Sequence, residues 1–243
     1  MNYDSLHGKN VLITGSAKRV GAALVRAFAA AGANVMIHCS RSRQEGQELL
    51  MEIGGTAKGH SLVFFDFTVP EDIVSFWKTL PVQPDILINN ASVFNRMTLQ
   101  EESLPVAKQQ LDVNFWAPVE MMRQMALHSS EQGEKQVINM LDQAVTKTPK
   151  DSFSYAISKK ALAEATRIAA LQFAPALRVN GICPGPVLPP VGLEHLKMQK
   201  TLSTLPLGRP VALDDLCNTA LFLALNRSMT GAFIYVDCGQ NLL

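Results

Sequence analysis

Short apolar runs alternate with longer amphipathic stretches along the whole chain. The longer stretches repeat their apolar residues at helical spacing, at 21–31, 44–53, 70–80, 104–128, 154–173 and 213–225. The short runs have the length of buried strands and lie at 11–14, 34–39, 62–65, 85–89, 136–141, 178–183 and 233–236. Strands that alternate with helices favour right-handed crossovers and a parallel sheet. The pattern therefore predicts an α/β fold, a doubly wound parallel sheet of seven strands with helices on both faces.

Length and composition favour a single domain. The 243 residues, 47% of them hydrophobic, are enough to bury one full core, so we expect one domain over 1–243. The net charge of +1, without a run of lysine or arginine, argues against nucleic acid as a partner. The four cysteines are scattered and show no metal-ligand spacing, which predicts reduced thiols and no metal. The sequence also contains no signal-peptide core and no apolar run long enough to span a membrane, so we expect a cytoplasmic protein.

One segment is irregular. Residues 184–210 contain six prolines and three glycines, too many for the interior of a helix or strand, except over 193–202, where a helix can form. Long segments of this kind are either ligand-covering lids or ordinary surface loops. The sequence leaves both interpretations open.

The first strand is followed by a turn of small residues that leads into a helix. Backbone N–H groups and the helix dipole at such a turn can hold a pyrophosphate. The turn departs from the usual glycine pattern because a bulky cation, Arg19, stands where a glycine is expected, and it can reach a cofactor phosphate or the substrate. The other residues that we assign to cofactor binding here are Gly15, Ser16, Val20 and Gly21.

The end of the second strand indicates which dinucleotide binds. NAD enzymes place an acidic residue there for the ribose 2′-hydroxyl, but this chain has none. A 2′-phosphate would instead find donors in His38, Ser40, Arg41 and Ser42, which predicts NADPH. In the alternative interpretation, Arg41 and Arg43 only solvate the start of a helix.

The third strand ends in two further residues that we assign to the cofactor. These are Asp66 and Phe67. Asp66 can accept a hydrogen bond from the adenine amine, or it can cap the next helix.

A tyrosine and a lysine stand one helical turn apart in the fifth predicted helix. Tyr155 and Lys159 share a face of that helix, so the ammonium is expected to lower the pKa of the phenol and prepare it for proton transfer.

In order and spacing, these motifs resemble the short-chain dehydrogenase/reductase family over nearly the whole chain. The resemblance rests on Thr14-Gly15 through Gly21, Asn89-Asn90-Ala91, Asn114, the Tyr155–Lys159 pair and Pro184-Gly185. It implies a Rossmann-type fold, a homotetramer, Lys159 on the nicotinamide ribose, Asn114 positioning a water in a proton relay, and Tyr155 as the proton donor. It also assigns Asn90, Ala91, Ser92, Pro184 and Gly185 to cofactor binding.

Two departures from the family pattern are similar to its pteridine reductase branch. They are Arg19 inside the turn and Asp142 where a catalytic serine is usual. That resemblance implies a flat pterin stacked between nicotinamide and Phe94, with Arg19, Ser92, Asp142 and Tyr155 as further substrate contacts. Reduction of a ring C=N bond needs a proton on nitrogen, so we expect a shielded, readily protonated Asp142 to share proton delivery with Tyr155. In the alternative interpretation, Asp142 only caps the following turn.

The predicted activity is NADPH-dependent reduction of a dihydropterin or dihydrofolate, and also of an oxidised pterin. A carbonyl or 3-oxoacyl-thioester reductase is the first alternative, but Asp142 and Arg19 oppose it. A protein that binds NADPH without turnover is the second, although the chain has every member of the proton relay.

Overall fold

A seven-stranded parallel sheet forms the centre of the protein, as the sequence predicts. The computed structural model describes residues 6–129, 135–189 and 202–243. The strand order is β3-β2-β1-β4-β5-β6-β7, and each neighbouring pair is parallel. The strands are β1 (Asn10–Ile13), β2 (Asn34–Cys39), β3 (Ser61–Phe64), β4 (Ile86–Asn89), β5 (Lys135–Met140), β6 (Leu177–Pro184) and β7 (Phe233–Val236).

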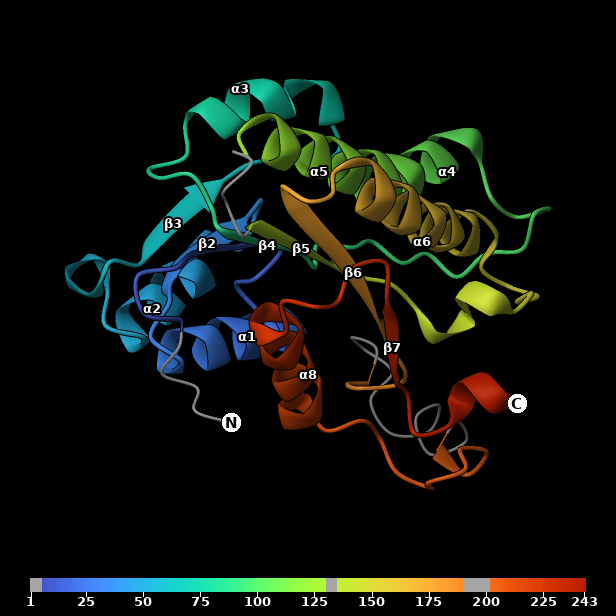
Figure 1. The fold of residues 1–243 in the computed structure, drawn as a ribbon. Helices are drawn as coiled ribbons and strands as arrows, with labels where there is room; N and C mark the ends of the chain where they lie inside the picture. Colours follow the sequence, from blue (N-terminus) through green and yellow to red (C-terminus); the bar gives the residue numbers. More distant parts are fainter. Residues whose placement is uncertain (1–5, 130–134, 190–201) are drawn as a thin grey trace.

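Helices cover both faces of the sheet and enclose two separate cores (Figure 1). One face carries α1 (Arg19–Ala30), α2 (Arg43–Glu52) and α8 (Leu213–Leu225). The other carries α3 (Ile73–Lys78), α4 (Leu104–Leu111), α5 (Ala117–Leu127) and α6 (Phe153–Gln172). Short 3-10 turns are Thr56–Lys58, Pro70–Asp72, Gln143–Thr146 and Gln240–Leu242. The central strands read as unbroken apolar runs because they are buried from both sides.

The helix predicted at 104–128 is confirmed as one helical run, with one feature that the prediction did not include. It is divided into α4 and α5 by a π turn, Asp112–Trp116, in its middle. The extra residue in such a turn widens the helix, and turns of this kind are frequent at functional sites. Asn114 lies in the π turn. The helix predicted at 70–80 is likewise a 3-10 turn followed by the shorter α3.

The order of the strands determines where a ligand can bind. The chain moves outward from β1 to β3, then returns to β4 on the other side of β1. In doubly wound sheets the crevice outside the carboxyl ends of the strands, at this switch point, is the binding site. The glycine turn follows β1 and Asn89-Asn90-Ala91 closes β4, so both predicted motifs meet there.

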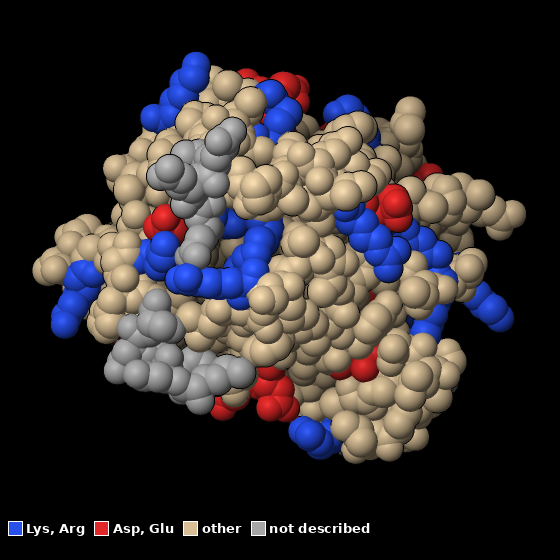
Figure 2. All heavy atoms as spheres, viewed as in Figure 1, with Lys and Arg blue, Asp and Glu red and all other residues tan. Residues whose placement is uncertain are grey.

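Three further observations concern the class of protein. In the part of the chain that the structure describes, no helix combines the length and apolar character needed to cross a bilayer. Within those same ranges, no group of three or more His, Cys, Asp or Glu side chains is placed to hold a metal ion. On the face drawn in Figure 2, lysine and arginine side chains stand in separate groups and form no continuous basic surface there. The helix predicted at 193–202 lies outside the described residues, except for Leu202.

Candidate active site

Tyr155 and Asp142 form the central contact of the site. Asp142 follows β5, Tyr155 lies in the first turn of α6, and the phenol hydroxyl donates to Asp142 Oδ2 over 2.9 Å. The other carboxylate oxygen, Oδ1, accepts from the Ala144 N–H at 2.7 Å and caps the following 3-10 turn. One oxygen of Asp142 therefore caps the turn, and the other contacts the phenol on which the proton-delivery interpretation depends.

Burial controls the titration of Tyr155 and Lys159. The pKa of Tyr155 is raised well above 10, first by burial and then by the negative charge of Asp142. The expectation that Lys159 lowers the Tyr155 pKa is therefore wrong as the net effect. The Lys159 ammonium lies 6.0 Å from the ring centre and donates to the Met140 carbonyl at 2.8 Å. Burial also lowers the pKa of Lys159 itself to about 8. The phenol therefore stays protonated at neutral pH.

Phe94 stands over the tyrosine. Its ring centre lies 4.6 Å from that of Tyr155, at an interplanar angle of 72°. The side chain is 54% exposed, so it is not a core residue. An exposed aromatic ring beside Tyr155 is suited to contact a flat ligand.

Asn114 is tied to the loop that precedes Phe94. Its Oδ1 accepts from the Val93 N–H and from the Ser92 hydroxyl, each at 2.9 Å, and its Nδ2 donates to the Val93 carbonyl at 2.8 Å. Asn114 is fully buried. Three of the four hydrogen-bonding positions of its side-chain amide are thus used within the protein.

A second network joins the same loop to α6. Fully buried Gln110 donates to Ser154 Oγ at 2.6 Å and accepts from the Asn95 N–H at 2.9 Å. The Glu102 carboxylate accepts from the N–H and hydroxyl of Ser154, the residue before Tyr155. Sequence reasoning missed this network. The position of Ser154 beside the tyrosine was the available signal, but nothing in the sequence identifies its partners.

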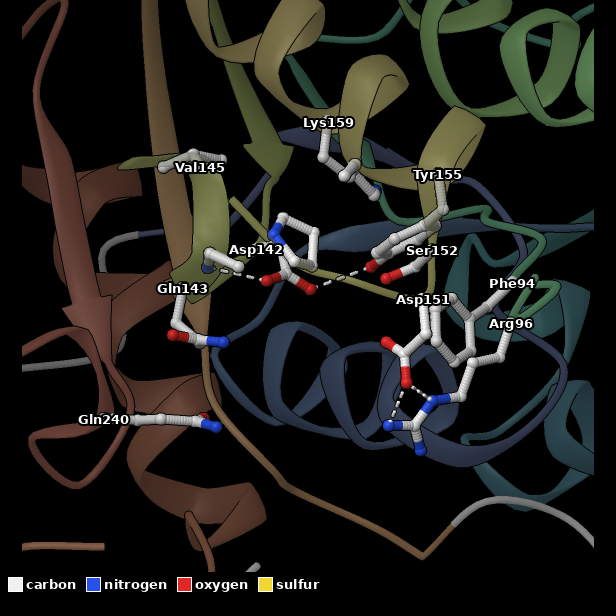
Figure 3. A pocket seen from close by; sticks show the side chains of 13 residues that line it. Phe94, Arg96, Asp142, Gln143, Val145, Asp151, Ser152, Tyr155, Lys159 and Gln240 are labelled. Atoms are coloured by element: carbon white, nitrogen blue, oxygen red, sulfur yellow. Dashed lines mark hydrogen bonds and ion pairs between the residues drawn. The ribbon is translucent and has the colours of Figure 1, made fainter. Parts of the chain in front are cut away.

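Two cavities meet at the tyrosine and the aspartate. One, of about 280 Å³, is shown in Figure 3, with the Gln143 and Gln240 side chains on one side and the Arg96–Asp151 ion pair on the other. The second, of about 370 Å³, reaches from Tyr155 toward Arg19 and the residues after β6. Phe94, Asp142, Tyr155 and Lys159 line both cavities. The reactive groups are therefore accessible from two sides.

A third cavity, of about 430 Å³, adjoins the glycine turn. It shares Arg19, Val20, Asn90 and Ser92 with the 370 Å³ cavity and is also lined by Gly15, Gly21 and Ala91. Gly15 has φ +59°, and a Cβ there would lie 2.7 Å from Ala91 Cα. A Cβ at Gly21 would lie 2.5 Å from the Gly15 carbonyl oxygen. Neither position can carry a side chain without moving the backbone.

The start of α1 fits an anionic group. Its first backbone bond runs from the Ala22 N–H to the Lys18 carbonyl, and no side chain caps the helix. The N–H groups of the first turn are thus left for a ligand, with the dipole favouring negative charge. Arg19 adopts φ +56°, which explains why glycine is usual there, and its guanidinium donates to the Pro189 carbonyl at 2.8 Å. These residues fit the pyrophosphate of a dinucleotide.

The structure corrects one predicted cofactor contact, that of His38. The side chains of Ser16, His38 and Phe67 are buried and bonded or packed inside the protein. His38 accepts from the Gly15 N–H at 3.0 Å, and its other ring nitrogen contacts the Phe65 carbonyl at 3.1 Å. The prediction that His38 donates to a 2′-phosphate is therefore wrong, and any cofactor contact of Ser16 or Phe67 is through the backbone.

The other predicted contacts lie at the expected edge of the sheet. Exposed Arg41 follows β2, with partly buried Ser40 and Ser42 on either side. The Asp66 carboxylate accepts from the Thr68 N–H at 3.1 Å, and bonds to Thr68, with the nearby Arg41 charge, lower its pKa. Pro184 and Gly185 line the 370 Å³ cavity beside Lys159.

The fold and the site define a Rossmann-type dehydrogenase or reductase. A family model described as Enoyl-(Acyl carrier protein) reductase matches residues 15–241. The L-xylulose reductase of Mus musculus is 30% identical over 96% of this chain and 97% of its own length. The chain belongs to the short-chain dehydrogenase/reductase family.

Two solved structures of FolM alternative dihydrofolate reductase 1, both complexed with NADP, are also similar. The protein from Brucella canis is 34% identical, with a TM-score of 0.87 over 98% of this chain and 96% of that one. The protein from Brucella suis is 34% identical, with a TM-score of 0.85 over 97% and 96% of the two chains.

Proposed function

We propose that this protein is an NADPH-dependent pterin reductase, which converts a dihydropterin or dihydrofolate to its tetrahydro form and also accepts an oxidised pterin. The observation that carries the proposal is the Tyr155–Asp142 hydrogen bond of 2.9 Å beneath the exposed ring of Phe94. Its substrate is a flat heterocycle with a C=N bond that must receive a proton on nitrogen.

The cofactor assignment rests on the uncapped start of α1 and on Arg41 at the end of β2. NADPH, when bound, supplies a hydride. The first-turn N–H groups of α1 and Arg19 would hold its phosphates, and Arg41 with Ser40 and Ser42 would hold the 2′-phosphate. Lys159 uses one of its three N–H donors on Met140 and keeps two for ribose hydroxyls. The two FolM structures with bound NADP support this assignment.

The protein's own residues handle the proton. Tyr155 is held protonated by its raised pKa, so it can donate to a ring nitrogen. Asp142, bonded to the same hydroxyl, would accept and return protons between solvent in the adjoining cavity and the phenol. Asn114 would position a water for this transfer. Phe94 would stack on the substrate, with Arg19 and Ser92 toward its polar edge.

The test is NADPH oxidation by the purified protein with dihydrobiopterin, dihydromonapterin and dihydrofolate, beside an acetoacetyl thioester. Turnover of one or more pterins without turnover of the thioester supports the proposal. Turnover of the thioester alone would show that Asp142 is a tolerated variation in a carbonyl reductase.

The carbonyl reductase alternative is favoured by the L-xylulose reductase relative and by the Tyr155–Lys159 pair. The variant Tyr155→Phe distinguishes a reductase from a protein that binds NADPH without turnover. A pure binder keeps its function in that variant, whereas a reductase loses turnover and keeps its NADPH affinity.

We also infer a homotetramer that uses α6. Ile157, Ile168 and Leu171 are 47%, 47% and 83% exposed, and their spacing, about three and four turns, places them on one face of the helix. Met121, Met122 and Met125 of α5 are core residues, since all three are buried, whereas Trp116 is 52% exposed. Sedimentation of Leu171→Lys against the unmodified protein tests the assembly.

A further inference from the structure

His38, near the end of β2, is buried and uses both ring nitrogens. It is 2% exposed; Nδ1 lies 3.0 Å from the Gly15 nitrogen and Nε2 lies 3.1 Å from the Phe65 carbonyl oxygen. The Gly15 N–H can only donate and the Phe65 carbonyl can only accept. These partners therefore require the neutral imidazole with its proton on Nε2.

The backbone of His38 bonds to Ser16, the second residue of the Gly15–Ser16 turn. The Ser16 N–H donates to the His38 carbonyl at 2.8 Å, and the His38 N–H donates to Ser16 Oγ at 3.1 Å. The ring is packed against Phe67 and Phe76, with centroids 4.5 and 5.7 Å away. The imidazole therefore has a fixed orientation between the turn and the residue that follows β3.

Gly15 is enclosed from two sides. A Cβ at Gly15 would meet Ala91 Cα, so the backbone already packs against the end of β4. On its other side the Gly15 N–H is bound to His38. The path of the turn into the uncapped start of α1 is thus set by Ala91 and by His38.

We propose that His38 is a positioning residue for the dinucleotide, one that touches no part of the cofactor and acts by fixing the Gly15–Ser16 turn. This inference rests on the cofactor assignment above. A lone acceptor such as a carboxylate, or a lone donor such as an ammonium, would satisfy only one of the two ring contacts. A neutral histidine satisfies both.

A second buried histidine provides a matched control. His60 is 6% exposed, and its Nδ1 accepts from the Val35 N–H at 3.1 Å, near the opposite end of β2. Replacing either histidine with leucine removes a buried imidazole and leaves a backbone N–H without its acceptor. Only His38 is bonded to the cofactor turn.

The experiment measures NADPH dissociation constants by titration calorimetry, and melting temperatures, for the unmodified protein, His38→Leu and His60→Leu. Both variants should melt earlier. His38→Leu should bind NADPH about tenfold more weakly, as expected for the loss of a buried hydrogen bond, while His60→Leu should stay within about twofold of the unmodified protein. Equal affinities in the two leucine variants would overturn the inference.

Two amide variants keep the test decisive if His38→Leu does not fold. His38→Asn keeps an acceptor near the position of Nδ1, whereas His38→Gln keeps a donor near the position of Nε2. The asparagine variant should bind NADPH the more tightly of the two, and equal or reversed affinities contradict the inference. If the unmodified protein binds no NADPH, the cofactor assignment fails, which is a separate result.

Discussion

The Tyr155 hydroxyl donates to Asp142 Oδ2 over 2.9 Å, and this contact joins the proton donor of the family to the residue that replaces its usual serine. A serine hydroxyl in that position can polarise a ketone oxygen. A carboxylate instead accepts a hydrogen bond from the phenol, and it adds to the effect of burial, which is the larger cause of the raised pKa of Tyr155. The substitution therefore favours a protonated tyrosine and a substrate atom that needs a proton.

Replacement of Asp142 should remove pterin reduction. We expect Asp142→Asn and Asp142→Ser to lower kcat about 100-fold, the usual contribution of a group in general acid–base catalysis. Both side chains can still accept from the Ala144 N–H, so the fold should persist. The pKa of Tyr155, followed by ultraviolet titration, should fall toward 10 once the negative charge is gone. Unchanged pterin turnover in both variants would show that Asp142 has no part in proton delivery.

Loss of the Glu102 carboxylate should weaken pterin binding and leave NADPH binding unchanged. Its carboxylate ties the loop after Phe94 to Ser154, so Glu102→Ala should let Phe94 move and raise the KM for the pterin about tenfold. The neighbouring Glu101 bonds only to Thr98 within its own turn, and Glu101→Ala is therefore the control. Steady-state kinetics and NADPH titration separate the effects. Equal KM values in the two variants would contradict this role of the network.

The buried His38 predicts an acid limit to stability. Burial lowers its pKa from 6.5 to about 4, so the unfolded chain takes up the proton first. Its contribution to the free energy of unfolding is complete above pH 6.5 and falls as the pH drops toward 4. The Asp66 carboxylate raises the pKa of His38, against the larger effect of burial. The pKa of Asp66 is itself lowered, so this carboxylate stays ionised as the pH falls from 6.5 toward 4.

Urea unfolding between pH 7 and 4.5 measures this dependence. The unmodified protein should lose stability more steeply than His38→Asn, because the variant lacks the titrating group. Parallel pH profiles for the two proteins would mean that His38 does not titrate as its surroundings require.

Arg41 should set the preference for NADPH. Arg41→Ala should weaken NADPH binding about tenfold and leave NADH binding nearly unchanged, since a charge-assisted bond to a phosphate is lost. Arg43→Ala is the control because the Arg43 guanidinium stacks over the Phe64 ring, 4.2 Å from its centre. NADPH and NADH are titrated against both variants. An unchanged NADPH affinity in Arg41→Ala would favour the alternative in which both arginines only solvate the start of α2.

The apolar pattern was sufficient to predict the sheet, because strands buried on both faces carry little else. The sequence analysis missed the π turn at Asp112–Trp116. The available signal was Pro118, which stands inside the predicted helix and lacks the N–H that would bond to the Asn114 carbonyl. The bonds of Asn114 to Val93 accompany this turn, and they join residues 21 positions apart.

In the candidate active site, too, the sequence predicts positions along the chain better than contacts between distant residues. Asp142, Tyr155 and Phe94 come together as the motifs predict, since each has a fixed place relative to a strand end or helix. The error at His38 has a definite cause. A polar residue at the end of a strand looks the same in sequence whether it faces a ligand or the backbone of Gly15, and only the fold decides between them.

The most direct test of pterin reduction follows the hydride itself. The purified protein is incubated with a dihydropterin and with NADPH in which both hydrogens on nicotinamide C4 are replaced by deuterium. The products are analysed by mass spectrometry. The account predicts a tetrahydropterin with one deuterium on a ring carbon, formed by the unmodified protein and lost in Asp142→Asn. An unlabelled pterin, under conditions in which an acetoacetyl thioester gains deuterium, would contradict it.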